Sequence, residues 1–152
     1  MRPLVASCSF LLLIFMAEGC QHHSVSADCP HDARLRTYKQ WRESVRFPYT
    51  APGVRRERIV KSYERVAVGS TKEEFVAALG EPDFEEELYP KEPNRPCRGY
   101  AFTYYFEKPQ DVVNDIRDKR IEAFFSPAGR ATWIASNVSG LSEKGNSSAI
   151  RK

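Results

Sequence analysis

Histidine and cysteine are scarce in this chain, and most of them lie together near its N-terminus. The 152 residues include three histidines and four cysteines. His22, His23 and His31 lie close to Cys20 and Cys29, and such a mixture could ligate zinc or copper, but the spacing fits no closed structural site. The segment also offers no nucleophile with an orienting acid. We therefore expect no catalytic residue, no metal and no cofactor, and interpret the histidines as part of a flexible tether.

The chain also lacks a large excess of positive or negative charge. The formal net charge is only +3 at pH 7, which is too small to indicate a nucleic-acid partner. Asp111, Asp115 and Asp118 could line one side of a turn, but the spacing of a calcium loop, with its glycine and terminal glutamate, is missing. We interpret them as a solvated polar loop, and Glu85-Glu86-Glu87 as an exposed strand edge whose charge discourages aggregation. The alternative for the triplet is that it binds a basic partner.

The longest apolar stretch, from Pro3 to Met16, is too short for a membrane-spanning helix, which needs roughly 20 apolar residues. Arg2 supplies a positive start, and Ala17 and Gly19 supply the small residues of a cleavage site. We interpret residues 1–19 as a signal peptide. An N-terminal membrane span is the weaker alternative.

The end of this segment, Ala17-Glu18-Gly19-Cys20, resembles a bacterial lipobox. That resemblance implies that Cys20 is acylated, becomes the new N-terminus and anchors the protein to a membrane. Gln21 resembles the pattern of lipoproteins sent to the outer membrane, so we expect a protein of the cell envelope that faces the periplasm. The alternative is an ordinary secretory signal, which would leave a soluble exported protein.

Two further cysteines, Cys29 and Cys97, remain outside the signal peptide and the lipid site. In an oxidising compartment two remaining thiols favour one disulfide. Because the bridge would close a long loop, the chain-entropy estimate for its stabilisation is roughly 4 kcal/mol. We therefore name Cys29 and Cys97 as a disulfide candidate.

After a polar tether at residues 20–32, the sequence predicts one domain over residues 33–138. An amphipathic helix is expected at 33–46, because its apolar residues fall on one helical stripe: Leu35, Tyr38, Trp41 and Val45. Prolines and a glycine in 47–53 end it, and a second short helix is expected at 55–65. The Ser/Gly/Lys-rich tail, 139–152, is predicted to be disordered.

The clearest local signal is a capped helix that begins after Thr71. Glu74 stands three residues on, which predicts a capping box. Gly80 can close the helix in a left-handed conformation, and Pro82 prevents its continuation.

Strands are expected at 84–88, 98–107, 119–126 and 131–137. The second alternates aromatic residues on one face, which we expect to pack against the helices: Tyr100, Phe102, Tyr104 and Phe106. Three further aromatic residues are expected on the opposite face of the sheet as candidates for a protein interface: Tyr105, Phe124 and Trp133. The alternative is that the helix carrying Trp41 covers them.

These motifs together resemble the SmpA/OmlA (BamE-like) family of small outer-membrane lipoproteins. The match consists of a Gly-x-Thr start, an apolar helix, a Leu-Gly-x-Pro end, an aromatic strand and a hairpin, and rests chiefly on Gly69, Thr71, Val76, Leu79, Gly80 and Pro82. The resemblance implies an α+β domain in which two N-terminal helices pack on a three- to four-stranded antiparallel sheet.

The function we expect is that of a non-enzymatic, membrane-anchored envelope lipoprotein that acts by protein–protein contact, in outer-membrane assembly or envelope integrity. Its partners would be an envelope protein of unknown identity and, through the N-terminal lipid, the membrane. The main alternative is a periplasmic inhibitor or immunity protein that binds and blocks an enzyme. A small enzyme or metal carrier is the third hypothesis.

Overall fold

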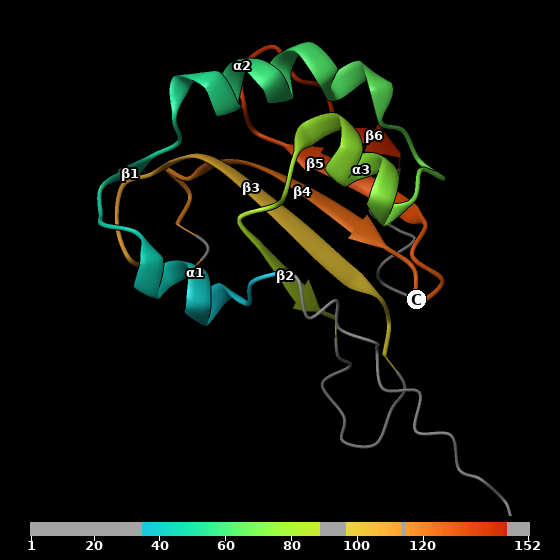
Figure 1. Ribbon diagram of the computed structural model, residues 1–152, viewed down its shortest axis with the longest axis horizontal. Coiled ribbons are helices and arrows are strands. Elements are labelled where there is room, and N and C mark those ends of the chain that lie inside the picture. The colour runs from blue at the N-terminus through green and yellow to red at the C-terminus, as the bar shows by residue number, and fades with distance from the viewer. Residues whose placement is uncertain (1–34, 89–96, 114, 146–152) are drawn as a thin grey trace, which may run out of the picture.

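The structure, a computed structural model, describes residues 35–88, 97–113 and 115–145 (Figure 1). In these ranges the fold is α+β, as expected, with an antiparallel sheet and three short helices. The helices are α1 (Tyr38–Ser44), α2 (Gly53–Ser62) with the 3-10 turn η1 (Tyr63–Arg65) after it, and α3 (Lys72–Leu79). The strands are β1 (Tyr49–Thr50), β2 (Phe84–Glu87), β3 (Tyr100–Lys108), β4 (Lys119–Phe125), β5 (Ala131–Ser136) and β6 (Lys144–Gly145).

Strand β3 is the centre of the sheet. One of its edges pairs with β2 near its start and with β1 at its end. Its other edge pairs with β4, which is followed outward by β5 and β6. All of these pairings are antiparallel.

Helices α2 and α3 cover one face of the sheet (Figure 1). The main core lies between them and the sheet, and the aromatic row of β3 points into it as predicted: Tyr100, Phe102, Tyr104 and Phe106. Phe75 of α3 meets Phe125 of β4 edge to face, with ring centroids 5.0 Å apart. In the described residues, no helix is long and apolar enough to cross a membrane.

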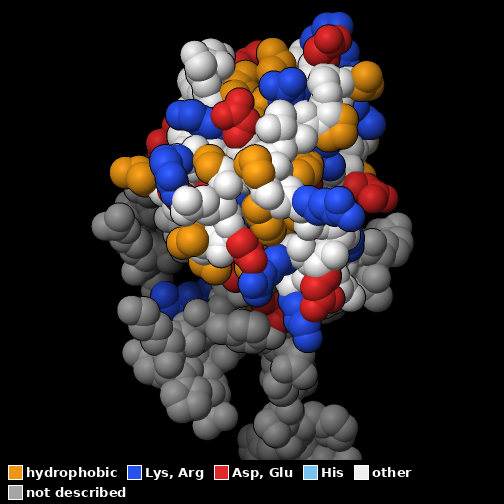
Figure 2. Space-filling model, turned by 90° about the vertical axis from the view of Figure 1, so that its left-hand side faces the viewer, with side chains coloured by type: hydrophobic (Ala, Val, Ile, Leu, Met, Phe, Trp, Pro, Cys, Tyr) orange, Lys and Arg blue, Asp and Glu red, His pale blue; other side chains and the backbone are white. Residues whose placement is uncertain are grey.

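Helix α1 lies on the opposite face, at the end of the sheet where β1 and β2 flank β3 (Figure 1). Trp41 is fully buried there and stacks on Tyr105 with ring centroids 4.9 Å apart. Phe84 of β2 completes this second, smaller core. Around α1 and β1, hydrophobic side chains are scattered among charged ones on the surface (Figure 2).

Helix α1 is shorter than the stripe at 33–46 predicts, because a stronger local signal sets its start. Thr37 and Gln40 form a capping box, so the helix begins at Tyr38. The preceding residues run along the outer edge of β2, where the Arg36 carbonyl accepts a hydrogen bond from the Glu85 amide. Leu35 consequently packs in the main core, on the other side of the sheet from Trp41.

The capping box of α3 is confirmed. The Thr71 hydroxyl accepts a hydrogen bond from the Glu74 amide, and the Glu74 carboxylate accepts one from the Thr71 amide at 2.8 Å. Gly80 follows with φ of 91°, a conformation that favours glycine. This helix could be predicted because its signals are local.

The sheet is larger than the resemblance implies, with six strands in place of three or four. Three helices are present, as the stripe at 33–46, the range 55–65 and the capped segment after Thr71 predict, whereas the resemblance implies two. The added strands β1 and β6 have two residues each, too few to show an alternating pattern. The predicted disordered tail needs correction for its first part, because Lys144–Gly145 form β6. Lys144 donates hydrogen bonds to the carbonyls of Tyr63 and Val66, which fix this segment. Residues 146–152 lie outside the described part.

A buried carboxylate joins the two layers. Strands β1 and β2 pair with different parts of the same edge of β3, and Asp83 lies in the gap that they leave between them. Its Oδ2 accepts a hydrogen bond from the Tyr105 amide at 2.6 Å. Its Oδ1 accepts one from Trp41 Nε1 at 3.1 Å, and Arg55 of α2 pairs with Oδ2 at 3.1 Å. Loss of solvent raises the pKa of the Asp83 carboxyl, although Arg55 and the hydrogen bonds act in the opposite direction.

We predict that Asp83→Asn lowers the free energy of unfolding by about 2 kcal/mol, because one buried donor then faces an amide NH₂ group and Arg55 loses its counterion. Urea unfolding with near-ultraviolet circular dichroism would measure it, since Trp41 reports on the α1 core. Asp111→Asn is the matched control, because the Arg42–Asp111 pair is largely exposed to solvent and should change stability little. Equal losses in the two variants would contradict the role of Asp83.

Candidate functional site

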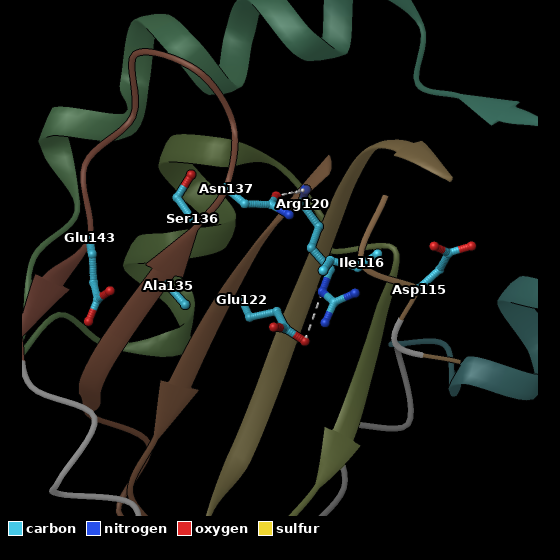
Figure 3. Close-up of a pocket in the computed structure, with 8 residues that line it drawn as sticks. All are labelled: Asp115, Ile116, Arg120, Glu122, Ala135, Ser136, Asn137 and Glu143. Carbon is cyan, nitrogen blue, oxygen red and sulfur yellow. Dashed lines mark hydrogen bonds and ion pairs between the residues drawn. The ribbon is translucent and has the colours of Figure 1, made fainter. Parts of the chain in front are cut away.

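Beyond α1, no described helix covers the second face of the sheet. We call this region the open face and define it by Arg120, Glu122, Phe124, Trp133 and Ala135. These side chains share one face because of the strand register: Glu122 lies opposite Ala135, and Phe124 opposite Trp133. A hollow of about 350 Å³ lies at this face and is lined by Asp115, Ile116, Arg120, Glu122, Ala135, Ser136, Asn137 and Glu143 (Figure 3).

An aromatic stack forms part of the open face. The rings of Phe124 and Trp133 lie 4.7 Å apart at an interplanar angle of 13°, and both side chains are half-buried. Trp133 Nε1 donates a hydrogen bond of 2.6 Å to Glu143, which fixes the outer ring. Tyr105, the third interface candidate, is buried beneath Trp41 with 4% exposure. Helix α1 thus covers Tyr105, as the alternative expects, and leaves the Phe124–Trp133 stack at the surface. The use of this stack as a protein interface stays a prediction.

The segment between β3 and β4, described for residues 109–113 and 115–118, is held against the sheet by a buried ion pair. Lys108 Nζ lies 3.0 Å from Asp118 Oδ2, both side chains are fully buried, and Nζ also donates to the Val112 carbonyl. Arg120 donates to Asp118 at 3.1 Å and pairs with Glu122 at 3.2 Å. The interpretation of Asp118 as part of a solvated loop is thus wrong.

This pinned segment presents apolar side chains to solvent. Val112, Val113 and Ile116 are exposed by 52%, 66% and 93% respectively. Ile116 also lines the hollow of the open face (Figure 3). Contiguous exposed apolar patches mark contact surfaces, whereas single exposed apolar residues are normal; here three of them gather on one anchored segment.

Carboxylates dominate the charge around the hollow. Arg117 holds the pKa of Asp115 at about 2 through hydrogen bonds, so this carboxyl stays ionised. Partial loss of solvation and the nearby negative charge of Glu122 raise the pKa of Glu86 on β2. In the described residues neither Glu86 nor Glu143 forms a salt bridge with a lysine or arginine, whereas Arg120 is already paired with Asp118 and Glu122.

A second hollow of about 320 Å³ lies beside α3, and its lining includes Leu35, Val76 and Phe102. Lys72 pairs there with Glu85 and lies 3.9 Å from the centroid of the Tyr100 ring. Glu85 is buried, with 2% exposure, so its interpretation as an exposed edge residue is also wrong. Each of these charges has a structural partner, so this hollow indicates packing rather than a reaction site.

Several residues named from the sequence lie outside the described ranges, namely Cys20, Cys29 and the three histidines. Cys97 is described and is disulfide-bonded. Its partner is outside the described residues, so the pairing with Cys29 stays a prediction. Across the described residues, no group of three histidine, cysteine, aspartate or glutamate side chains is placed to hold a metal ion.

Sequence reasoning missed the charged members of this site, chiefly Arg120 and Glu122. The signal was present, because both alternate with Phe124 along β4 and therefore share its face. Glu143 could not be found in this way, because its position depends on the turn that returns β6 to β5. Comparisons with known protein families, with curated protein sequences and with solved structures find no match.

We predict that Asp118→Asn releases residues 109–118 from the sheet, because the buried Lys108 ammonium loses its counterion. Stability should fall by about 3 kcal/mol, and amide hydrogen exchange should accelerate in this segment more than in α3. Hydrogen-exchange mass spectrometry measures both regions in one sample. Asp111→Asn, a change in the same segment at an exposed pair, is the control, and uniform acceleration across the chain would contradict local pinning.

A second prediction concerns the charge of Glu86. Glu122→Gln should lower the pKa of Glu86 toward its ordinary value, because a like charge is removed. Carboxyl-detected nuclear magnetic resonance over a pH series measures this midpoint. Glu57→Gln removes an exposed carboxylate from α2 and should leave the midpoint unchanged; an unchanged midpoint in Glu122→Gln would show that the two carboxylates do not interact.

Proposed function

We propose that this protein is an exported envelope lipoprotein, anchored to the outer membrane through Cys20, that works by contact with another protein. The observation that carries the contact function is the Phe124–Trp133 stack, whose half-buried rings lie at the surface of the sheet. Large aromatic side chains of this kind are enriched at the centres of protein interfaces. The exposed apolar residues of segment 109–118 extend the same surface.

Two observations support export and anchoring. The segment Ala17–Cys20 resembles a lipobox and follows an apolar stretch of signal-peptide length. Cys97 is disulfide-bonded, a state typical of oxidising compartments such as the periplasm. Two or more acyl chains provide stable membrane anchoring, because each buried methylene contributes about 0.8 kcal/mol.

Relationship to the SmpA/OmlA family is part of this proposal. The α3 region carries the residues on which the resemblance rests, and in the structure Thr71 caps the helix and Gly80 closes it. A role in outer-membrane assembly or envelope integrity would follow from membership. The short strands β1 and β6 and the anchored segment between β3 and β4 are additions to the expected pattern. Strand β6 and the anchored segment border the surface to which we assign the contact.

Intact-protein mass spectrometry of the membrane fraction from a bacterial host tests the anchor. We expect a chain that begins at Cys20 and carries a diacylglycerol and an amide-linked acyl chain. Cys20→Ser should abolish the modification, because the acceptor sulfur is lost, while Cys8→Ser should still yield the acylated chain since Cys8 lies in the removed segment. A wild-type chain without lipid would overturn the anchor and favour a soluble periplasmic inhibitor.

A further inference from the structure

We propose that the open face binds a cationic side chain, arginine or lysine, of an extended segment in the partner protein. This inference deepens the contact function proposed above and rests on it. The occupant is defined by its chemistry: positive charge next to the aromatic stack, and apolar groups next to segment 109–118.

The register of the sheet places the necessary groups in one row. Glu86 lies opposite Ala101, Ala101 opposite Phe124, Phe124 opposite Trp133, and Trp133 opposite Gly145. Because neighbouring strands lie about 4.8 Å apart, the backbones of Glu86 and Phe124 are about 10 Å apart. The stack is therefore flanked by Ala101 and Gly145, which are small, with a carboxylate beyond Ala101.

A carboxylate is present on the other side of the stack as well. Glu143 accepts the hydrogen bond of Trp133 Nε1 and so lies at the outer ring. An arginine or lysine at this place would meet an aromatic ring and a carboxylate together, two groups that attract cations by different means.

The charge balance selects a cation over an anion. Glu86 and Glu143 form no salt bridge with a described lysine or arginine. Burial and, to a smaller extent, the negative charge of Glu122 raise the pKa of Glu86, so a positive charge nearby would favour its ionised form. Arg120 is the one cationic residue of the open face as we define it, and it is already engaged with Asp118 and Glu122. An acidic partner would meet these carboxylates without a free counter-charge on this face.

An extended partner segment also explains the apolar border. Ile116 lines the hollow and is 93% exposed, and Val112 and Val113 lie on the same anchored segment. A strand-like segment alternates its side chains, so one that alternates cationic and apolar residues can place a charge near the stack and an apolar group near Ile116. A lone small cation would leave these apolar groups unused.

The two tryptophans of the chain provide a site-specific test. The full chain in detergent is labelled with ¹⁵N and titrated with three blocked peptides, which alternate valine with arginine, with glutamine or with glutamate. The indole N–H signal of Trp133 reports on the open face, and that of Trp41, buried against Asp83, is the internal reference. We expect the arginine peptide to shift the Trp133 signal and to bind at least about five-fold tighter than the other two.

The double variant Glu86→Gln/Glu143→Gln removes both carboxylates, while the side-chain amide oxygen introduced in place of the Glu143 carboxylate can still accept the Trp133 hydrogen bond. Affinity for the arginine peptide should fall about five-fold or more, whereas Glu57→Gln, an exposed change on α2, should have no effect. An unchanged Trp41 signal shows that each variant is folded.

Four results would overturn the inference: no Trp133 shift at millimolar peptide, equal binding of the acidic peptide, unchanged affinity in the double variant, or binding of arginine amide as tight as that of the peptide. The last would indicate a site for a small cation. The membrane anchor is tested separately. If a chain that is never acylated still binds the arginine peptide, the proposed binding surface stands and only the proposed anchor is wrong.

Discussion

The positions of α1 and α2 on the two faces of the sheet depend on the Asp83 carboxylate, which lies at the edge of β3 that pairs with β1 and β2. Strands β1 and β2 pair with the same edge and leave a gap between them, where the Tyr105 amide would lack a partner. Asp83 supplies that partner and at the same time holds Trp41 of α1 on one face and Arg55 of α2 near the other. A single side chain thereby replaces a strand hydrogen bond and sets where α1 lies on the sheet.

The limited length of α1 follows from its ends and produces the open face. The Thr37 capping box starts the helix late, and the helix ends at Ser44, before the prolines that follow. Trp41 covers Tyr105, but a helix of seven residues spans only about 10 Å. Phe124 and Trp133, one and two strands further across the sheet, consequently remain at the surface.

The sequence predicts the parts of this fold that depend on local signals. The capping box at Thr71, the closing Gly80 and the aromatic alternation of β3 are each complete within a few residues, and all three are confirmed. Burial of Asp118 and Glu85 could not be predicted in the same way, because their partners come from other elements: Lys108 lies across a loop, and Lys72 belongs to α3. The residues of the candidate site could be predicted only in part. Alternation along β4 places Phe124 on the outer face of the sheet, but it does not show where α1 ends and therefore which residues of that face stay uncovered.

The buried charges of this protein hold together segments that come from different elements. Desolvation raises the pKa of the Asp83 carboxyl, and its three partners act in the opposite direction. Buried ion pairs often have such a balance, and one of their documented roles is to specify a single arrangement. Lys108 and Asp118 fit that role, because their pairing holds segment 109–118, with its exposed valines and Ile116, beside a rigid aromatic stack. A contact surface composed of pre-positioned side chains loses less conformational entropy on association, so the anchoring of this segment would lower the entropic cost of binding a partner.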